Sequence, residues 1–498
     1  MQRRDLLKRS AAGLTILRSG MLRGQTAPSN RLNVALIGVW GRGTAHYNAL
    51  RNENVVALCD VDWERAAEAF YRIKDAKQYK DFRNMLEEMK DIDACTISTP
   101  DHTHAPAAVM AMSLGKHVYV QKPLTHTVAE ARLLTTLARE KQVATQMGNQ
   151  GHCGNGVRDL CEMLWSGAIG EVKECHIWTN RPVWPQGLSR PDIVSSAPET
   201  LDWDRWLGPA PYRPFVDKHP VTGNDCYRPF VWRGWWDFGT GAMGDMACHI
   251  LGAPNLALKL GLPTSVECIS KEGVSPFMFP KKSVTKFEFP ARGSMPPVTL
   301  YWYDGCKETP KINGVPEGEL LGDLPVSMRA MKERMAAMGG GQGQGQRQRM
   351  CAPPFTGIIG RTFNYGDYLK MKEDPDARVP PPDGSLFIGD KGMITTGTYG
   401  EQTRHIPVAK MQDYRFPQPL LTRSPGHYRD WIRACKGGEP ACSNLDVAAP
   451  FVEWMLLGVI ALRVEGKLMY DGAKMRFTNN NEANQYLKPT FRKGWSFA

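Results

Sequence analysis

A glycine-rich turn near the start of the chain constrains the fold more than any other feature. Residues 31–37 form an apolar run, and the sequence GVWGRG follows at residues 38–43, at the start of a helical stretch. Glycines between a strand and a helix allow a tight turn and let a phosphate group approach the helix N-terminal amides. The residues expected to line this turn are Gly38, Trp40, Gly41, Arg42 and Gly43, with the tryptophan where the usual G-x-G-x-x-G spacing has its middle glycine.

The segments after the turn alternate short apolar runs with amphipathic stretches. The apolar runs lie at residues 54–60, 94–100, 117–123 and 143–148, and the stretches with helical character lie at 43–51, 63–75, 82–90, 104–114 and 127–140. Apolar strands separated by helices indicate a parallel sheet that is covered on both faces. We therefore predict an α/β protein whose N-terminal domain, residues 31–150, is a doubly wound parallel sheet of the Rossmann type.

Beyond residue 150 the pattern changes to strand-like runs with few helices between them. These runs lie at residues 171–179, 264–270, 283–290 and 297–305, and residues 385–397 have the pattern of a hairpin. Such a series predicts an α+β domain over residues 151–498 with a largely antiparallel, open sheet. An apolar helix at 451–464 is expected to pack between the two domains. The open sheet would offer a pairing surface for a homo-oligomer.

Two segments of the second domain differ from it in composition. Residues 181–237 are rich in proline and tryptophan and read as a loop-rich insert, and residues 310–355 contain the low-complexity run GGGQGQGQRQR. The tryptophans allow two interpretations. Their faces can stack on a sugar ring, or they can anchor the insert to the apolar core.

Residues 1–30 read as an export signal rather than as part of the fold. Arg3 and Arg4 precede a short apolar stretch at residues 10–17 and a small-residue region that ends at Ala27. A basic start, an apolar centre and a small-residue exit describe a signal segment, and the arginine pair is similar to the twin-arginine export motif. We therefore expect a periplasmic or otherwise exported protein.

Charge and hydropathy argue against two other classes of protein. The net charge of +11 includes +5 from residues 1–27, and the remaining chain has no lysine or arginine run. A nucleic-acid-binding protein needs a concentrated basic stripe, so we expect no nucleic-acid partner. No uncharged apolar run reaches the roughly 18 residues that span a bilayer, so no stable membrane anchor is expected. The 12 cysteines form no C-x-x-C pair, which argues against a zinc site and a disulfide framework.

An acidic residue follows the second predicted strand. Asp60 lies 22 residues after Gly38, where a carboxylate can accept hydrogen bonds from both hydroxyls of an adenosine ribose. It would also repel a 2′-phosphate, so the pattern favours NAD as the cofactor. NADP stays an alternative because Arg65 is close in sequence.

Polar residues also cluster at the ends of the later strands, where open α/β sheets bind their ligands. A lysine at this edge can reach the nicotinamide ribose or a substrate hydroxyl. The further candidates for contact with the cofactor are Thr99, Pro100, His102, His104, Gln121, Lys122 and Asn149.

Asp245 and His249 form another pair, four residues apart. On an α-helix this spacing places both side chains on one face, where a carboxylate and an imidazole can act as an acid/base pair near neutral pH. Two metal ligands can share this spacing, but no clear third ligand is present, so no metal site is expected. A purely structural pair is the remaining alternative.

Together these motifs resemble the glucose–fructose oxidoreductase, inositol dehydrogenase and rhizopine-catabolism family (Gfo/Idh/MocA), including its exported, twin-arginine members. The resemblance runs from residue 31 to FRKGW at 491–495 and includes HYRDWIRACKGGEPACSN at 427–444. It implies that Lys122 contacts the nicotinamide ribose and the reacting hydroxyl, and that Asp245 and His249 are a D-x-x-x-H pair with the histidine as proton acceptor. The family has a glutamate before the lysine, where this chain has Gln121.

The motifs and the resemblance predict a nicotinamide-dependent oxidoreductase that acts on a hydroxyl of a small carbohydrate: a sugar, a polyol or a glycoside. We expect its cofactor to be tightly held and recycled. A second hypothesis is a glycoside hydrolase that uses the same cofactor for transient oxidation and elimination. A third is a cofactor-binding scaffold without turnover, suggested by Gln121 and Trp40.

Overall fold

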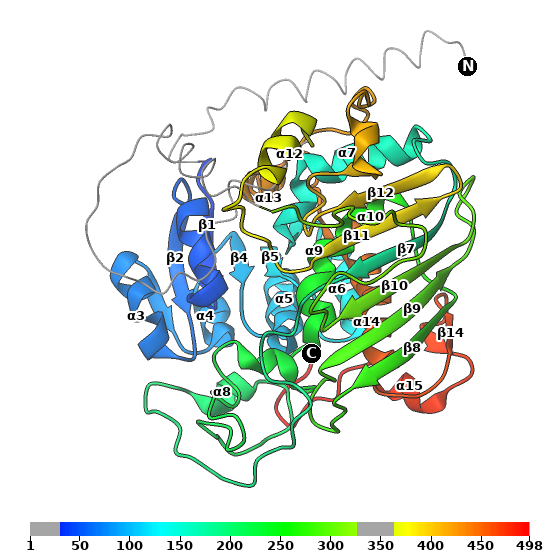
Figure 1. Ribbon diagram of the computed structural model, residues 1–498. Helices are drawn as coiled ribbons and strands as arrows, with labels where there is room; N and C mark the ends of the chain where they lie inside the picture. Colours follow the sequence, from blue (N-terminus) through cyan, green and yellow to red (C-terminus); the bar gives the residue numbers. More distant parts are fainter. Residues whose placement is uncertain (1–29, 326–362, 498) are drawn as a thin grey trace, which may run out of the picture.

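Two sheets lie side by side in the computed structural model, which describes residues 30–325 and 363–497 (Figure 1). The predicted signal segment, apart from its last residue, lies outside the described residues. Most of the predicted low-complexity loop at 310–355 does so as well.

The first sheet has six parallel strands in the order β3-β2-β1-β4-β5-β6. Its strands are β1 (Asn33–Ile37), β2 (Asn54–Cys59), β3 (Lys77–Tyr79), β4 (Ala94–Ile97), β5 (His117–Gln121) and β6 (Thr145–Gly148). The order reverses between β1 and β4, which confirms the predicted doubly wound Rossmann sheet. The sequence analysis missed β3, because this short edge strand is polar and lacks an apolar run.

Helices cover both faces of this sheet. They are α2 (Ala45–Ala49), α3 (Trp63–Arg72), α4 (Phe82–Glu88), α5 (His104–Ser113) and α6 (Val128–Lys141). The helix predicted at 43–51 is partly wrong, because a 3-10 turn at Gly41–Thr44 precedes the short α2. Local capping fixes the start of α6, where Thr127 and Glu130 form a capping box.

The second sheet has nine strands in the order β13-β12-β11-β7-β10-β9-β8-β14-β15, and only β7 and β10 pair in parallel. Its strands are β7 (Val172–Trp178), β8 (Ser265–Glu272), β9 (Lys282–Phe289), β10 (Val298–Asp304), β11 (Gly384–Gly389), β12 (Gly392–Thr396), β13 (Arg404–Ile406), β14 (Leu468–Asp471) and β15 (Arg476–Phe477). The predicted largely antiparallel sheet and its hairpin are therefore confirmed.

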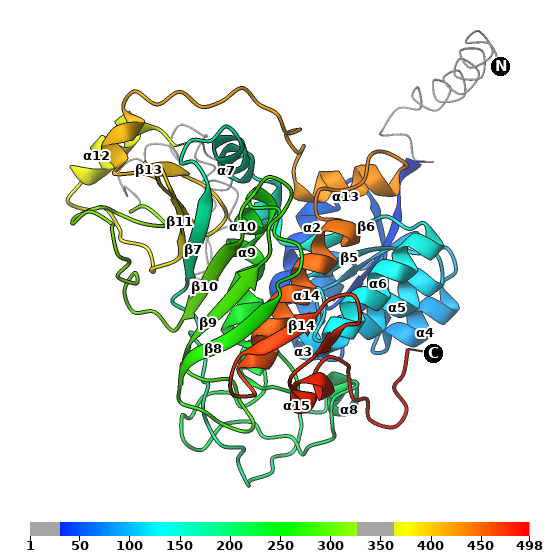
Figure 2. The ribbon, with the colours of Figure 1, turned by 90° about the vertical axis from the view of Figure 1, so that its right-hand side faces the viewer.

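One long buried helix joins the two sheets. Helix α14 (Leu445–Ala461) contacts α6 on one side and β8 and β9 on the other, as predicted for the apolar run at 451–464 (Figure 2). The remaining helices of this part are α7 (Asn155–Trp165), α8 (Trp203–Leu207), α9 (Cys248–Ile250), α10 (Gly252–Ala257), α12 (Tyr365–Lys372), α13 (His427–Cys435) and α15 (Asn481–Gln485). Among the described residues, no helix is long and apolar enough to cross a membrane.

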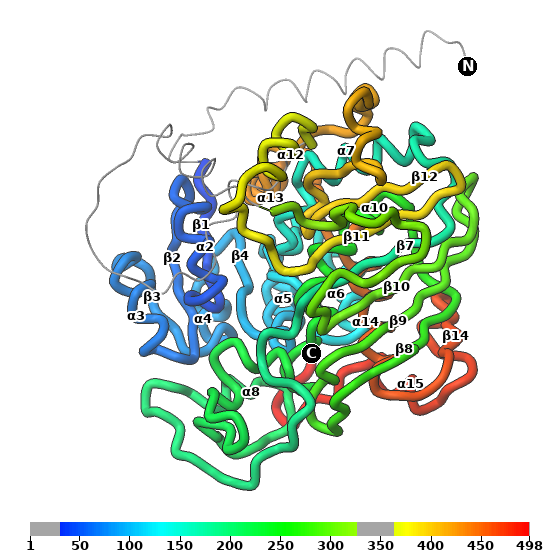
Figure 3. Tube along the Cα trace, viewed as in Figure 1, coloured from blue at the N-terminus to red at the C-terminus, as the bar shows by residue number. Residues whose placement is uncertain are grey.

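The tryptophan-rich insert at 181–237 contains α8 (Figure 3). It packs around a small apolar core that Met278 completes from outside the insert. Trp203, Trp206 and Trp235 are buried in this core, and the rings of Trp203 and Trp206 stack. These three residues therefore anchor the insert, which decides between the two interpretations of their role. Trp232 is less buried and lies beside Arg233.

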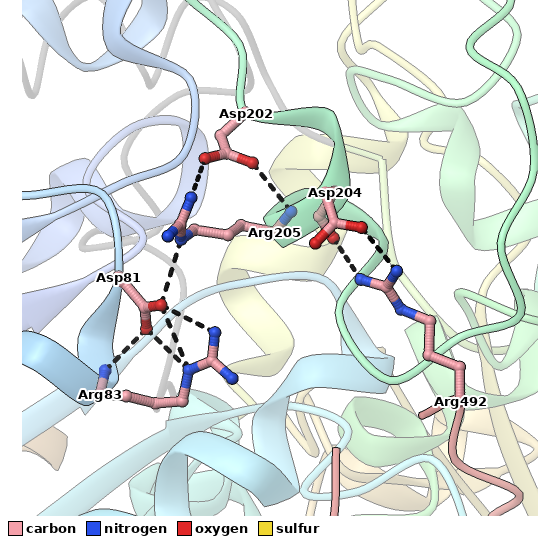
Figure 4. A network of polar contacts seen from close by, with 6 residues as sticks. All are labelled: Asp81, Arg83, Asp202, Asp204, Arg205 and Arg492. Carbon is pink, nitrogen blue, oxygen red and sulfur yellow. Dashed lines mark hydrogen bonds and ion pairs between the residues drawn. The ribbon is translucent and has the colours of Figure 1, made fainter. Parts of the chain in front are cut away.

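A network of three carboxylates and three arginines fastens the insert to its surroundings (Figure 4). Arg205 on α8 contacts both Asp81 and Asp202, and Asp81 also binds Arg83. Asp204 on the same helix pairs with Arg492 from the C-terminal segment. The network thus links the Rossmann domain, the insert and the C-terminal segment.

Candidate functional site

The glycine turn lies between the carboxyl ends of β1 and β4, where the strand order reverses. Gly38 has a φ of +79°, and a Cβ atom there would lie 2.7 Å from the backbone of Ser98. A Cβ atom at Gly43 would lie 2.2 Å from the carbonyl oxygen of Gly38. Gly41 has a φ of +60° and faces open space. Close packing and left-handed backbone conformations therefore account for these glycines.

Two side chains flank the turn. Trp40 lies at the N-cap of the 3-10 turn, and the guanidinium of Arg65 lies 4.8 Å from the centre of its ring. Arg42 points toward α13, where its Nη2 atom lies 3.5 Å from the hydroxyl oxygen of Tyr428. The C-terminal segment thus helps to enclose the turn.

Asp60 braces the turn from the end of β2. Its Oδ2 atom accepts a hydrogen bond from the backbone N–H of Val39 at 2.9 Å, and its Oδ1 atom accepts one from Asp62 at 3.0 Å. Burial raises the pKa of Asp60 to about 6. Each carboxylate oxygen retains a lone pair, so the side chain can still accept hydrogen bonds from ribose hydroxyls.

The two histidines after β4 bind backbone carbonyl groups. The ring nitrogens of His102 lie 3.2 Å from the carbonyl oxygens of Phe238 and Trp206. Those of His104 lie 2.7 Å and 2.8 Å from the carbonyl oxygens of Pro123 and Thr99. Burial lowers the pKa of His102 to about 3 and that of His104 to about 4. Both rings therefore hold the loop after β4, whose first turn starts from Pro100.

Several buried polar atoms near these strand ends lack a partner among the residues that the structure describes. They are the hydroxyl of Thr99, both side-chain polar atoms of Gln121 and Nδ1 of His249. Asn149, by contrast, accepts a hydrogen bond from the hydroxyl of Ser443 at 2.7 Å. Buried polar groups are normally paired, so the unpaired set indicates that a polar ligand completes the site.

Lys122 and Asp245 meet at the centre of the site. The Nζ atom of Lys122 lies 2.8 Å from Oδ1 of Asp245 and 2.6 Å from its carbonyl oxygen. Arg233 approaches the same Oδ1 atom with its Nε atom at 3.1 Å, and Nε of Arg181 lies 3.8 Å from Oδ2. Burial would raise the pKa of Asp245, but Lys122 and Arg233 outweigh it and hold this pKa well below its usual range.

His249 does not pair with Asp245, because the expected α-helix is interrupted. Asp245 lies in a π-helical turn at Met243–Ala247, and His249 lies in α9, which follows it. Burial and the charge of Lys122 lower the pKa of His249 well below its usual range, so its imidazole is neutral at pH 7. Its ring packs edge-to-face on Tyr399, with the ring centres 5.0 Å apart.

Asp101 adds an ionisable group to the centre. Its Oδ2 atom accepts a hydrogen bond from the hydroxyl of Thr240 at 2.7 Å. Burial raises the pKa of Asp101 to about 7, although Thr240, Arg233 and Lys122 act in the opposite direction. This carboxyl is therefore close to half-protonated at neutral pH.

The structure thus brings the predicted Lys122, Asp245 and His249 together and adds residues that the sequence analysis missed. The missed residues are Arg181, Arg233, Thr240 and Tyr399. Arg181 lies in an irregular part of the insert and Arg233 in a single 3-10 turn, Val231–Gly234, and neither is long enough for a periodic pattern to mark a site. Asp101 lies just after β4, at the sheet edge where polar residues were expected to bind a ligand. Its polar neighbours in the sequence were the signal that pointed to a site there.

The fold and the site define a class of protein. A doubly wound sheet with a glycine turn at its switch point and an acidic residue after the second strand is a dinucleotide-binding domain. Beside it, Lys122, Asp245 and His249 form a polar centre.

Two stretches of the chain match models of the Gfo/Idh/MocA oxidoreductase family. Residues 32–149 match its "Oxidoreductase family, NAD-binding Rossmann fold", and residues 181–267 match its "Oxidoreductase family, C-terminal alpha/beta domain". The two matches fall in the two domains of the structure.

Curated proteins are similar to part of the chain. The chain is 30% identical over 184 residues to inositol 2-dehydrogenase from Salmonella typhimurium, an alignment that covers 35% of this chain and 54% of that protein. It is 29% identical over 181 residues to a glycosyl hydrolase family 109 protein from Shewanella pealeana, which covers 33% of this chain and 38% of that protein. The chain therefore spans about half or less of the length of these relatives.

A solved structure supports the fold over most of the chain. The WlbA dehydrogenase from Bordetella pertussis, determined in complex with NADH and UDP-GlcNAcA, superposes with a TM-score of 0.53 at 14% identity. The superposition covers 89% of this chain and 99% of that one.

The residues of the site fit a nicotinamide dinucleotide. The glycine turn with Arg42 offers a seat for the pyrophosphate, and Asp60 offers acceptors for the adenosine ribose. The unpaired groups of Thr99 and Gln121 are available at the other end, beside Lys122. NAD is therefore the cofactor that this domain holds.

Proposed function

We propose that this protein oxidises a hydroxyl group of a sugar, polyol or glycoside with NAD as hydride acceptor. The observation that carries the proposal is the ion pair of Lys122 with Asp245 at the end of β5, together with the unpaired polar atoms of Gln121 and His249. The kinship with a protein named inositol 2-dehydrogenase supports a polyhydroxylated substrate.

Lys122 and His249 have different roles in the proposed reaction. Bound NAD supplies the hydride acceptor, and the substrate carbon becomes a carbonyl as it loses a hydride. Lys122 orients and polarises the hydroxyl oxygen, and its contacts to Asp245 fix the position of its ammonium group. His249 accepts the hydroxyl proton as general base, a role for which a neutral imidazole is required.

The test begins with protein purified without added nucleotide and then incubated with a panel of sugars, polyols and glycosides. Absorbance and extraction report the redox state of the nicotinamide, and mass spectrometry identifies the product. A keto product formed with NADH supports the proposal. Retention of NAD without hydride transfer to any member of the panel would favour the scaffold without turnover.

A second candidate is NAD-dependent glycoside hydrolysis, supported by the kinship with a protein named for glycosyl hydrolase family 109. Oxidation of a ring hydroxyl acidifies the neighbouring C–H, the aglycone leaves by elimination, water adds, and the ketone is reduced again. Release of the aglycone with no net change in NAD would favour this reaction. Accumulation of a keto-sugar would favour simple oxidation.

The sequence also supports export through the twin-arginine route, with NAD already inside the folded protein. Arg3 and Arg4 carry this part of the proposal. A double variant, Arg3→Lys with Arg4→Lys, should keep the protein in the cytoplasm when cell fractions are compared. After export no free NAD pool surrounds the protein, so dialysed mature protein should retain nearly stoichiometric NAD(H). An unchanged distribution of the variant would refute the route.

A further inference from the structure

Three basic side chains of the site share one ionic partner. Lys122, Arg181 and Arg233 each form an ion pair with Asp245, and this is the only ion pair of each among the described residues. All three lie mostly within the protein, with side chains between 14% and 26% exposed. One carboxylate therefore faces three positive charges in a partly desolvated site.

Of the three basic side chains, Arg181 makes the weakest contact with Asp245. Nζ of Lys122 and Nε of Arg233 both contact Oδ1 of Asp245, at 2.8 Å and 3.1 Å. Nε of Arg181 lies 3.8 Å from Oδ2 of the same carboxylate. This Nε atom is buried and has no hydrogen-bond partner. Arg181 binds the side chain of Asn180 with its Nη1 atom, so its Nε–H is a charged donor without an acceptor.

The neighbouring carboxyl groups do not remove the imbalance. Among the described residues, neither Asp101 nor Asp383 forms an ion pair with any of the three cations, and burial raises the pKa of both carboxyl groups. One carboxylate oxygen of Asp383 also accepts a hydrogen bond from the backbone N–H of Asn180 at 2.8 Å. An uncompensated positive charge is costly in a buried site, and an anionic ligand would stabilise it.

The cofactor does not account for the excess charge. The pyrophosphate seat lies at the glycine turn on β1, where Arg42 is the nearby cation. Arg181 and Arg233 belong to the insert of the second domain and meet Asp245 beside Lys122, where the substrate hydroxyl is expected. Their charge therefore faces the substrate rather than the phosphates.

We propose that the substrate is a sugar acid, a uronic or aldonic acid, whose carboxylate is received by Arg181 with the help of Arg233. The planar guanidinium is the side chain best matched to a carboxylate, and Arg181 still has a free donor for it. Lys122 then remains free to contact the hydroxyl that is oxidised. This inference rests on the proposed function and specifies its substrate.

The test compares matched pairs of substrates, such as glucose with glucuronate and galactose with galacturonate, on the NAD-loaded protein. A charged hydrogen bond contributes about 1.5–3 kcal/mol. The value of kcat/KM should therefore be about 10- to 100-fold higher for the acid than for the neutral sugar of each pair. Equal use of acid and neutral sugar would overturn the inference while leaving the proposed function intact. Turnover confined to phosphate or sulfate esters would also overturn it.

A variant series identifies the residue responsible. Arg181→Gln should lower kcat/KM for the acid about 10- to 100-fold and lower it much less for the neutral partner. Arg181→Lys should restore part of the loss, because it keeps the charge but not the planar fork. Arg139→Gln removes the same charge from an exposed pair and serves as the matched control. Equal losses for acid and neutral sugar in Arg181→Gln would refute the role.

Calorimetry supplies a readout that does not depend on turnover. Glucuronate and galacturonate should release heat on binding to the NAD-loaded protein, and Arg181→Gln should weaken that binding without changing the affinity for NAD. If no sugar changes the redox state of the cofactor, the proposed function fails, and acid binding by the wild type alone then still supports the anion site. If neither acid binds, the inference is overturned.

Discussion

Two clusters of charged side chains in this protein differ in their balance. The cluster around α8 contains three arginines and three carboxylates, and it joins the insert to the Rossmann domain and the C-terminal segment (Figure 4). The cluster around Asp245 contains three cations and one fully ionised carboxylate. The charges of the first cluster balance one another without a ligand. The second cluster has more positive than negative charge.

Charge balance and burial distinguish a structural network of charged side chains from a functional one. Balanced pairs at a partly exposed junction add modest stability and need nothing further. Unbalanced charge in a more buried place is destabilising, and a chain retains it where the charge acts on a ligand. The comparison predicts that changes in the two clusters will have different effects on activity and on stability.

The largest expected effect is on catalysis in the Asp245 cluster. His249→Ala removes the proposed general base, so the rate of hydride transfer should fall by about 10²- to 10⁴-fold while NAD binding stays intact. Stopped-flow measurement of NADH formation tests this, with Asp204→Asn in the balanced cluster as control. A loss smaller than about tenfold would contradict the role of His249.

Removal of the shared carboxylate should have the largest effect on stability. Asp245→Asn leaves Lys122, Arg181 and Arg233 without a counter-charge, and breaking such a buried pair costs about 3–5 kcal/mol. Urea unfolding of the variant measures the loss. The matched change Asp81→Asn leaves two arginines that are more exposed, and it should cost clearly less. Similar losses in both variants would remove the distinction between the clusters.

Arg205→Gln probes the balanced cluster from its basic side. The side chain of Arg205 is 40% exposed, and Asp81 retains Arg83 as a partner, so the free energy of unfolding should fall by only about 1 kcal/mol. The rate of hydride transfer should stay at the wild-type value. A large loss of activity would show that this junction is coupled to the catalytic centre.

A further effect concerns the pH dependence of stability. The folded state holds the proton of Asp101 more tightly than the unfolded state, because burial raises its pKa from 3.8 to about 7. This contribution to stability is present at low pH and is lost as the pH rises between these two values. Asp101→Asn keeps an acceptor for Thr240, so its unfolding temperature should fall less over this range than that of the wild type. Identical pH profiles would contradict the assignment.

The sequence by itself determined the elements that local patterns encode. Apolar runs with a glycine turn predicted the parallel sheet, and the position of Asp60 after β2 follows from the same periodicity. Lys122 could be placed at a sheet edge because it directly follows the strand β5. In these cases the informative residues are neighbours in the chain, so periodicity and spacing contain the answer.

Only the tertiary structure decided how the charges of the site are shared. Lys122 and Asp245 lie 123 residues apart in the sequence and meet through the packing of two domains. Arg181 comes from an irregular segment and Arg233 from a short 3-10 turn, beside the buried Trp235, and neither belongs to a repeating pattern. The π-helical turn likewise separated Asp245 from His249, although their spacing fits one face of an α-helix. Electrostatic balance depends on distances between side chains from remote parts of the chain, and local sequence patterns do not encode those distances.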